Sequence, residues 1–362
     1  MNALPPLRSS SEATPPPEED RSVHTLYPDE GRHVSASKFA GDDSDDVYSD
    51  EEILRFLQES AGETRKQTAR FKDSNFLPSA ENRTLSLEVF PSRSLKRLRA
   101  NVASIRKMLT LGTDFMTVTY GAAGSKQEGT KEIVTWLAQA GVPTFAHLTC
   151  HAENLADLDA TIDELLELGV TGILALRGDE RGDGKHLVLE HATDLIARIR
   201  ARGEAAGVPI NIAVAAFPTG HPESRDLDED ALTIARKQEA GANFAITQHF
   251  FSTEDYTRFI GLVHSHGSDL PIVPGLSPIT SYRRLERMCE LASIEIPADL
   301  ARNLQAAVDD KEAFREIAVE TTVTLAKELA EAGVPGIQLF TMNDDSTAAR
   351  VISRIAPFFG KT

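Results

Sequence analysis

The stretch TLSLEVFPSR at residues 84–93 decides the fold, because it is an apolar run that stops on polar and turn-forming residues. Seven runs of the same kind follow it: DFMTVTYG (114–121), PTFAHLTC (143–150), GILALRGDE (172–180), PINIAVAAFP (209–218), NFAITQHFF (243–251), PIVPGLSP (271–278) and PGIQLFTMN (335–343). The segments between successive runs are long enough for one helix each. Eight strand–helix units in succession predict an α/β protein, a closed (β/α)8 TIM barrel.

In such a barrel the functional residues gather at the carboxyl ends of the strands. The runs end on or near Glu88, Thr119, His147, Asp179 and Gln248. We therefore expect these side chains, which are far apart in sequence, to surround one mouth.

Composition excludes several kinds of partner. The net charge of −17 disfavours nucleic acid and anionic membrane surfaces. The chain has no secretory signal and no apolar run of about 18 residues or more, so no membrane partner is expected. Its two cysteines, Cys150 and Cys289, form no CxxC motif. That usage fits a reducing compartment and predicts a cytoplasmic protein.

Three regions are predicted along the chain. Residues 1–48 form a disordered Pro/Ser/acidic tail, and 40–52 alone carry 7 carboxylates. Residues 49–80 are expected to be an extra helix and a linker, with the helix docked over one end of the barrel. Residues 81–362 form the catalytic barrel, in which about 290–332 should hold two or three helices.

Glu88 is the first candidate for chemistry. It lies between Leu87 and Val89, and apolar neighbours are expected to raise the pKa of a carboxyl. A raised pKa suits a general acid near neutral pH. The alternative is a surface or salt-bridged glutamate on a strand edge.

The run ALRGDE at 175–180 is the second candidate. Arg177 offers a fork of donors for phosphate or carboxylate, Gly178 permits close backbone approach, and Asp179 adds an acceptor. An ordinary charged turn is the alternative.

His147, Cys150 and His151 have a spacing that metal ligands can share. No further group of strong metal ligands lies near these residues in the sequence, so no metal is expected. His147 is expected to hydrogen-bond a ligand oxygen, or to be a satisfied core histidine.

The segment 227–240 predicts an amphipathic helix. Asp230, Thr233, Arg236 and Lys237 fall in one polar sector of about 120°. Two adjacent cations on a helix can bind a pyrophosphate. The alternative is that this polar sector is simply the face of the helix exposed to solvent. GAAGSK at 121–126 lacks the Walker spacing and no GxGxxG follows a strand, so a nucleotide cofactor would be held differently.

Together, LEVFPSR, VTYGA, AHLTC, ALRGD, AAFPTGHPES, ITQHFF and PGLSP resemble the methylenetetrahydrofolate reductase family, which makes 5-methyltetrahydrofolate. The similarity covers about 84–357 and is to the bacterial type, as a catalytic barrel only. It implies a barrel that binds FAD at its strand ends and reduces 5,10-methylenetetrahydrofolate with NADH or NADPH. The product would feed methionine synthesis. Self-association into a homo-oligomer is left open.

The resemblance also implies roles for single residues. Glu88 matches the catalytic acid, and Asp179 matches an acidic residue near flavin and pterin that helps the folate intermediate form. Substrate contacts fall on Asp179, Gln248 and Arg284. The implied flavin-binding set comprises Thr119, Tyr120, Ala122, His147, Arg177, Gly178, Asp179, Ala192, Phe217, His221, Asp230, Thr233, Arg236 and Lys237.

Four positions depart from the family pattern. Phe217 stands where Tyr is common, and Asp344 replaces an Arg. Arg284 falls where a Gln helps bind folate, and Met288 replaces an aromatic residue. The glutamate tail of folate is therefore expected to be held differently, by Arg283 or Arg284.

Two other functions are compatible with a barrel. A pterin-binding methyltransferase would share the folate but need no flavin. A non-catalytic scaffold would use the acidic tail to find partners, and the presence of Glu88, Asp179 and Gln248 together argues against it.

Overall fold

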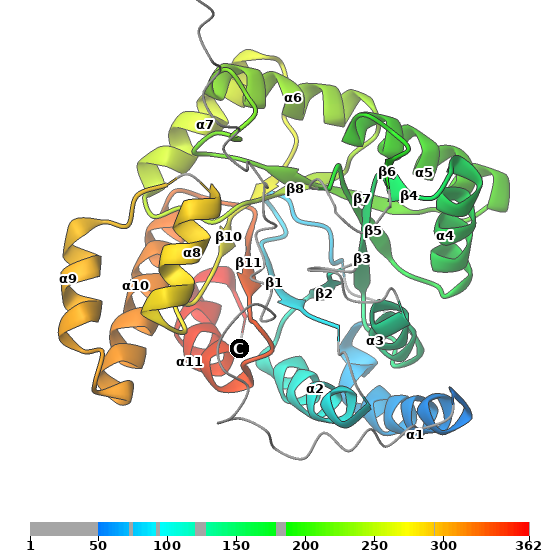
Figure 1. Ribbon diagram of the computed structural model, residues 1–362, viewed down its shortest axis with the longest axis horizontal. Coiled ribbons are helices and arrows are strands. Elements are labelled where there is room, and N and C mark those ends of the chain that lie inside the picture. The colour runs from blue at the N-terminus through cyan, green and yellow to red at the C-terminus, as the bar shows by residue number, and fades with distance from the viewer. Residues whose placement is uncertain are drawn as a thin grey trace, which may run out of the picture.

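The computed structural model describes residues 50–71, 75–91, 95–119, 128–178, 186–292 and 294–361. A ring of parallel strands lies at the centre and helices surround it (Figure 1). The strands are β1 (Thr84–Val89), β2 (Phe115–Val118), β3 (Thr144–Thr149), β4 (His151–Ala152), β5 (Gly172–Leu176), β6 (His186–Leu187), β7 (Asn211–Ala216), β8 (Phe244–Thr247), β9 (Ile272–Val273), β10 (Gly275–Leu276) and β11 (Gly336–Phe340). The helices are α1 (Asp50–Thr68), α2 (Leu95–Met108), α3 (Glu128–Gln139), α4 (Leu155–Glu167), α5 (Ala192–Ala206), α6 (Leu227–Glu239), α7 (Thr253–Ser265), α8 (Tyr282–Ala292), α9 (Ala298–Ala306), α10 (Lys311–Glu331) and α11 (Asp345–Ile355).

The strand order β10-β11-β1-β2-β3-β5-β7-β8-β9 closes on itself. β9 and β10 are two parts of one predicted strand, interrupted at Pro274, which has no N–H to donate. β9 pairs with β8 and β10 pairs with β11, both in parallel. The predicted (β/α)8 barrel is therefore confirmed. β4 and β6 form a separate antiparallel pair beside it.

Aromatic rings fill the amino-terminal end of the barrel. The ring of Phe115 lies 5.1 Å from that of Phe145 and 5.8 Å from that of Phe244, measured between centroids. β2 and β8 stand opposite each other in the ring, so a contact between their side chains places these residues in the interior. Phe76 and Leu77 pack against the same cluster and cover this end.

The predicted extra helix is present as α1, but it lies on the flank of the barrel, next to α2 and α3 (Figure 1). Leu57 and Ala61 are buried in the main core. Arg65 Nε donates to the carbonyl of Gln139 at the end of α3 (2.7 Å). The expected position over one barrel end is wrong, because residues 76–77 occupy that place.

The predicted helices between the last two strands are α8, α9 and α10. They enclose a small core of their own, which includes Leu285, Leu304 and Phe314. No helix in the described ranges is both long and apolar enough to cross a membrane.

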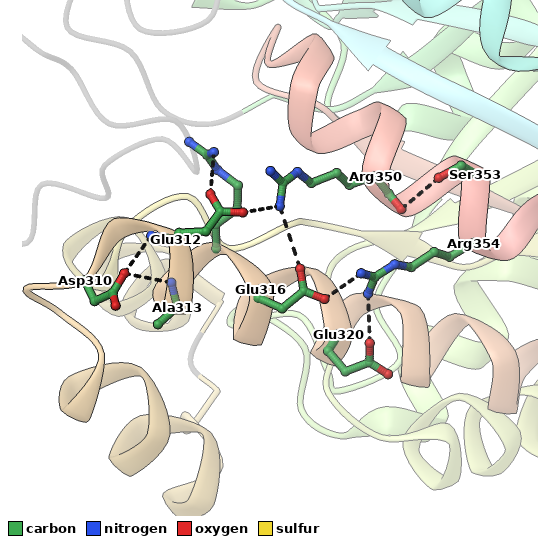
Figure 2. A network of polar contacts seen from close by, with 9 residues as sticks. Asp310, Glu312, Ala313, Glu316, Glu320, Arg350, Ser353 and Arg354 are labelled. Carbon is green, nitrogen blue, oxygen red and sulfur yellow. Dashed lines mark hydrogen bonds and ion pairs between the residues drawn. The ribbon is translucent and has the colours of Figure 1, made fainter.

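A ladder of charges joins α10 to α11 (Figure 2). Glu312, Glu316 and Glu320 are spaced four residues apart on α10 and face Arg350 and Arg354 on α11. These side chains are partly exposed, so each pair contributes only about 0.2–1 kcal/mol. As a set they tie the helix before β11 to the helix after it.

Candidate active site

A polar layer lies inside the barrel above the phenylalanines. Gln338 on β11 donates through Nε2 to Thr117 Oγ1 on β2 (2.7 Å) and accepts from Ser86 Oγ on β1. Thr117 follows Phe115 by two residues, so both point inward. Ser86 therefore points inward too, and so does Glu88, two residues further on.

Glu88 and His147 meet in this interior. Their side chains are 3% and 6% exposed, and Glu88 Oε2 lies 3.6 Å from His147 Nε2. Burial lowers the pKa of His147 to about 3, so the imidazole is neutral near pH 7. The structure thus brings together two predicted residues from β1 and β3, as a buried carboxyl beside an uncharged ring.

Two threonine hydroxyls are buried at the same end of the barrel. Among the described residues, Thr119 Oγ1 after β2 and Thr149 Oγ1 on β3 have no hydrogen-bond partner. Buried polar groups without partners are costly, so these atoms suit the polar edge of a ligand.

The turn after β5 approaches this region closely. Gly178 has φ +85°, and a Cβ there would lie 2.6 Å from His151 Nδ1, so only glycine fits. Arg177 forms an ion pair with Glu223 in the loop after β7. Tyr120, Ala122 and Asp179 lie outside the described residues.

The predicted polar sector of α6 is divided in the structure. Lys237 is buried and its Nζ donates to the carbonyl of Ala215 on β7 (2.7 Å). Asp230 is also buried and accepts from His221 N (2.9 Å) and Ser224 Oγ (2.8 Å). Lys237 thus ties α6 to β7, and Asp230 ties α6 to the loop after β7.

The rest of the sector faces outward. Arg236 is exposed, and Thr233 Oγ1 donates to the carbonyl of Glu229 within the helix (2.9 Å). The wheel placed all four residues on one face, but it could not show which of them the neighbouring strand would cover. Burial lowers the pKa of Lys237 to about 8, with a partly compensating effect of Asp230.

Comparison with known proteins decides the family. The model of the family "Methylenetetrahydrofolate reductase" matches residues 74–356. The chain belongs to this family. It is 35% identical over 294 residues to methylenetetrahydrofolate reductase 2 of Schizosaccharomyces pombe, covering 75% of this chain but 45% of that protein. It is 32% identical over 268 residues to 5,10-methylenetetrahydrofolate reductase of Escherichia coli, covering 72% of this chain and 86% of that protein.

A solved structure supports the fold alone. An uncharacterized protein from Clostridium thermocellum, described as binding two copies of 5-methyl-5,6,7,8-tetrahydrofolic acid, superposes with a TM-score of 0.54. The two chains are 15% identical, and the match covers 75% of this chain and 94% of the other.

The remaining residues implied by the methylenetetrahydrofolate reductase family lie around the barrel rim. Phe217, after β7, packs edge-on against His221 with 4.7 Å between ring centroids. Gln248 directly follows β8 and is half-buried, and Ala192 is the first residue of α5. Arg284 is exposed on α8, where its Nη1 donates to Thr280 Oγ1 (3.3 Å).

Asp344, which the resemblance places where an Arg is expected, caps a helix. It caps the amino terminus of α11, accepting from the backbone N–H groups of Ser346 and Thr347 (both 3.1 Å). Burial pulls the pKa of Asp344 upward, but hydrogen bonds from Thr347 and Ser346 bring it below its ordinary value. Met288 packs against the α8–α10 core.

The polar layer of Ser86, Thr117 and Gln338 was missed by sequence reasoning. The sequence did contain a signal for this layer, because each of the three is a polar residue with apolar residues on both sides in its strand. Within the described ranges, no group of three or more His, Cys, Asp or Glu could hold a metal ion.

His249, next to Gln248, is another buried neutral histidine. Its Nδ1 accepts from the backbone N–H of Ser277 (3.1 Å), so in the neutral ring the proton resides on Nε2. Burial lowers the pKa of His249 to about 4, below the ordinary value of about 6.5.

This shift predicts a loss of stability in acid. As the pH falls through about 6.5, His249 is protonated in the unfolded chain before it is protonated in the native state. The free energy of unfolding should therefore fall by about 2 kcal/mol through His249 between about pH 7.5 and pH 5. His249→Asn keeps an acceptor for the backbone N–H of Ser277, but its side chain does not titrate. Over the same pH range the free energy of unfolding of this variant should therefore fall by about 2 kcal/mol less than that of the wild type. Urea unfolding at several pH values measures both proteins, and parallel curves would contradict the assignment.

Proposed function

We propose that this protein reduces 5,10-methylenetetrahydrofolate to 5-methyltetrahydrofolate, using NADH or NADPH and bound FAD. Family membership supports an oxidoreductase that acts on methylenetetrahydrofolate. The observation that carries the proposal is the buried Glu88 carboxyl, 3.6 Å from an uncharged His147 at the carboxyl ends of the strands. The product would feed methionine synthesis, and a cytoplasmic location and a homo-oligomer stay predictions.

The residues present fit a flavin. The unpartnered hydroxyls of Thr119 and Thr149 and the glycine-only turn at Gly178 suit a ligand with a polar edge that approaches the backbone closely. We propose that Thr119, Tyr120, Ala122, His147, Arg177, Gly178, Asp179, Ala192, Phe217, His221, Asp230, Thr233, Arg236 and Lys237 form its site, Lys237 by holding α6 against β7 through the Ala215 carbonyl. When bound, the flavin supplies electron transfer between nicotinamide and folate.

Glu88 would act by moving a proton. Burial favours the neutral form of a carboxyl, and neutral His147 offers no positive charge to oppose that preference. A neutral carboxylic acid here can protonate a ring nitrogen of the methylene-bridged folate, which opens the five-membered ring. The bridging carbon then becomes the electron acceptor. Asp179 would help this ring-opened form of the folate to arise.

The folate and nicotinamide would contact Gln248 at the end of β8. We propose Arg283 and Arg284 for the glutamate tail of folate, since both are exposed on α8. Asp344 cannot serve this purpose, because its carboxylate would repel the carboxylates of the tail; it caps α11 instead.

An absorbance spectrum tests the proposal. The purified protein should be yellow, its flavin band should bleach on anaerobic addition of NADH or NADPH, and methylenetetrahydrofolate should restore it. Tetrahydrofolate, which lacks the methylene bridge, should leave the band bleached. A colourless protein would instead favour a pterin-binding methyltransferase.

A further inference from the structure

The turn after β11 has an unusual backbone. The β1–β11 ladder ends at the pair Glu88–Phe340, and the chain then passes through Met342 (φ 50°) and Asn343 (φ 59°). These are the non-glycine residues with positive φ in the described part of the chain. Left-handed backbone is unfavourable for a residue such as Met and is tolerated better by Asn. Such an outlier at the barrel mouth calls for a functional explanation.

The turn brings two side chains back onto β1. Asn343 Oδ1 accepts from the backbone N–H of Phe90 (2.9 Å), and its Nδ2 donates to the carbonyl of the same residue (3.0 Å). Thr341 Oγ1 donates to the carbonyl of Glu88 (2.6 Å), and Thr341 N donates to it as well (3.3 Å). Hydrogen bonds from the side chains of Thr341 and Asn343 thus continue the contact with β1 as far as Phe90. This residue lies two positions beyond Glu88, where the paired part of β11 ends.

The turn is anchored on its other side. Ser104 Oγ on α2 donates to the carbonyl of Asn343 (2.8 Å) and bonds Asp345 Oδ1 (2.8 Å). Asp344 caps α11, so the turn is fixed between two helices. A fixed turn can hold β1 in one position.

We propose that Thr341 and Asn343 are positioning residues that clamp the carboxyl end of β1 and so hold the Glu88 carboxyl at its place beside His147. This inference rests on the proposed function, in which Glu88 donates the proton. On its other edge this part of β1 is held by β2, through Val89–Val118 and the bond from Thr119 N to Val89 O (3.1 Å). Loss of the clamp would leave the end of β1 held on this side only by Thr341 N at Glu88 O (3.3 Å) and by Asn101 Nδ2 at Phe90 O (3.2 Å), a weaker hold that lets Glu88 shift.

Two pairs of variants test the clamp. Thr341→Val removes the hydroxyl with little change in shape, and Thr341→Ser restores it. Asn343→Gly removes the bonds to Phe90 while accepting the left-handed backbone. Lys107→Ala is the matched control, because it deletes the exposed ion pair with Asp345 at the same turn without touching β1.

The two half-reactions are measured separately by anaerobic stopped flow. Thr341→Val and Asn343→Gly should slow flavin reoxidation by methylenetetrahydrofolate by about 10- to 100-fold, the usual effect of misplacing a catalytic group. Flavin reduction by the nicotinamide should stay close to wild type. Thr341→Ser and Lys107→Ala should keep both rates. Equal losses in both half-reactions, no loss, or no recovery with Ser would overturn the clamp.

A second readout does not depend on activity. In protein labelled with 13C at glutamate carboxyl carbons, the Glu88 resonance is the one that Glu88→Gln removes. Its chemical shift and pH midpoint should change in Thr341→Val and Asn343→Gly but not in Lys107→Ala. If they change in a protein that does not reduce the folate, the clamp stands and the proposed function fails. An unchanged resonance rejects the clamp whatever the activity.

Discussion

Glu88→Gln should slow reduction of methylenetetrahydrofolate by about 10²–10⁴-fold, the usual contribution of general acid catalysis. The amide fills the same space beside His147 but cannot donate a proton as the acid does. Reduction of the flavin by NADH or NADPH needs no such proton, so that rate should stay near the wild-type value. The loss therefore falls on one half-reaction.

Stopped-flow absorbance at the flavin band follows each half-reaction separately. Glu312→Gln is the control, because it makes the same isosteric change in the exposed ladder between α10 and α11. Comparable losses in both half-reactions, in a variant that still binds flavin, would show that Glu88 is not the acid.

Gly275→Ala should lower the free energy of unfolding by about 3 kcal/mol, at the upper end of the usual cost of overpacking. A Cβ at Gly275 would lie 2.1 Å from the carbonyl oxygen of Thr247 and 2.6 Å from the Phe340 ring. The oxygen belongs to the backbone of β8 and cannot rotate away. The barrel would have to open where β10 closes it.

Gly261→Ala is the matched control for this change. Gly261 lies within α7, and an added Cβ there has no neighbour within 4 Å. Alanine is the better helix former, so this variant should be more stable by about 0.5–1 kcal/mol. Urea unfolding measures both variants against wild type. If Gly275→Ala were as stable as Gly261→Ala, the close packing of β8, β10 and Phe340 would be refuted.

Strand positions were predictable from the residues because parallel strands are covered on both faces. Such strands form short apolar runs, and β5, β7 and β8 lie within the runs at 172–180, 209–218 and 243–251. Glu88 stood out for the same reason, as a charged residue inside such a run. The location of α1 was not predictable, since an amphipathic pattern shows that a helix has a buried face but not what covers it.

The same limit applied to α6. Helical periodicity grouped Asp230, Thr233, Arg236 and Lys237, but β7 and its loop cover two of them and leave Arg236 in solvent. The hydrogen bonds that a buried lysine makes depend on the strand it reaches, which lies outside any local pattern.

By itself the sequence determined the barrel, the order of its strands and the chemical groups at their ends, because side-chain alternation and apolar runs are local properties. Tertiary structure alone decided which of those groups meet. Thr341 and Glu88 are 253 residues apart, and Gln338 and Thr117 are 221 apart. Contacts of this kind depend on the stagger of the strands and on which side chains face each other across the ring, and no local pattern encodes either.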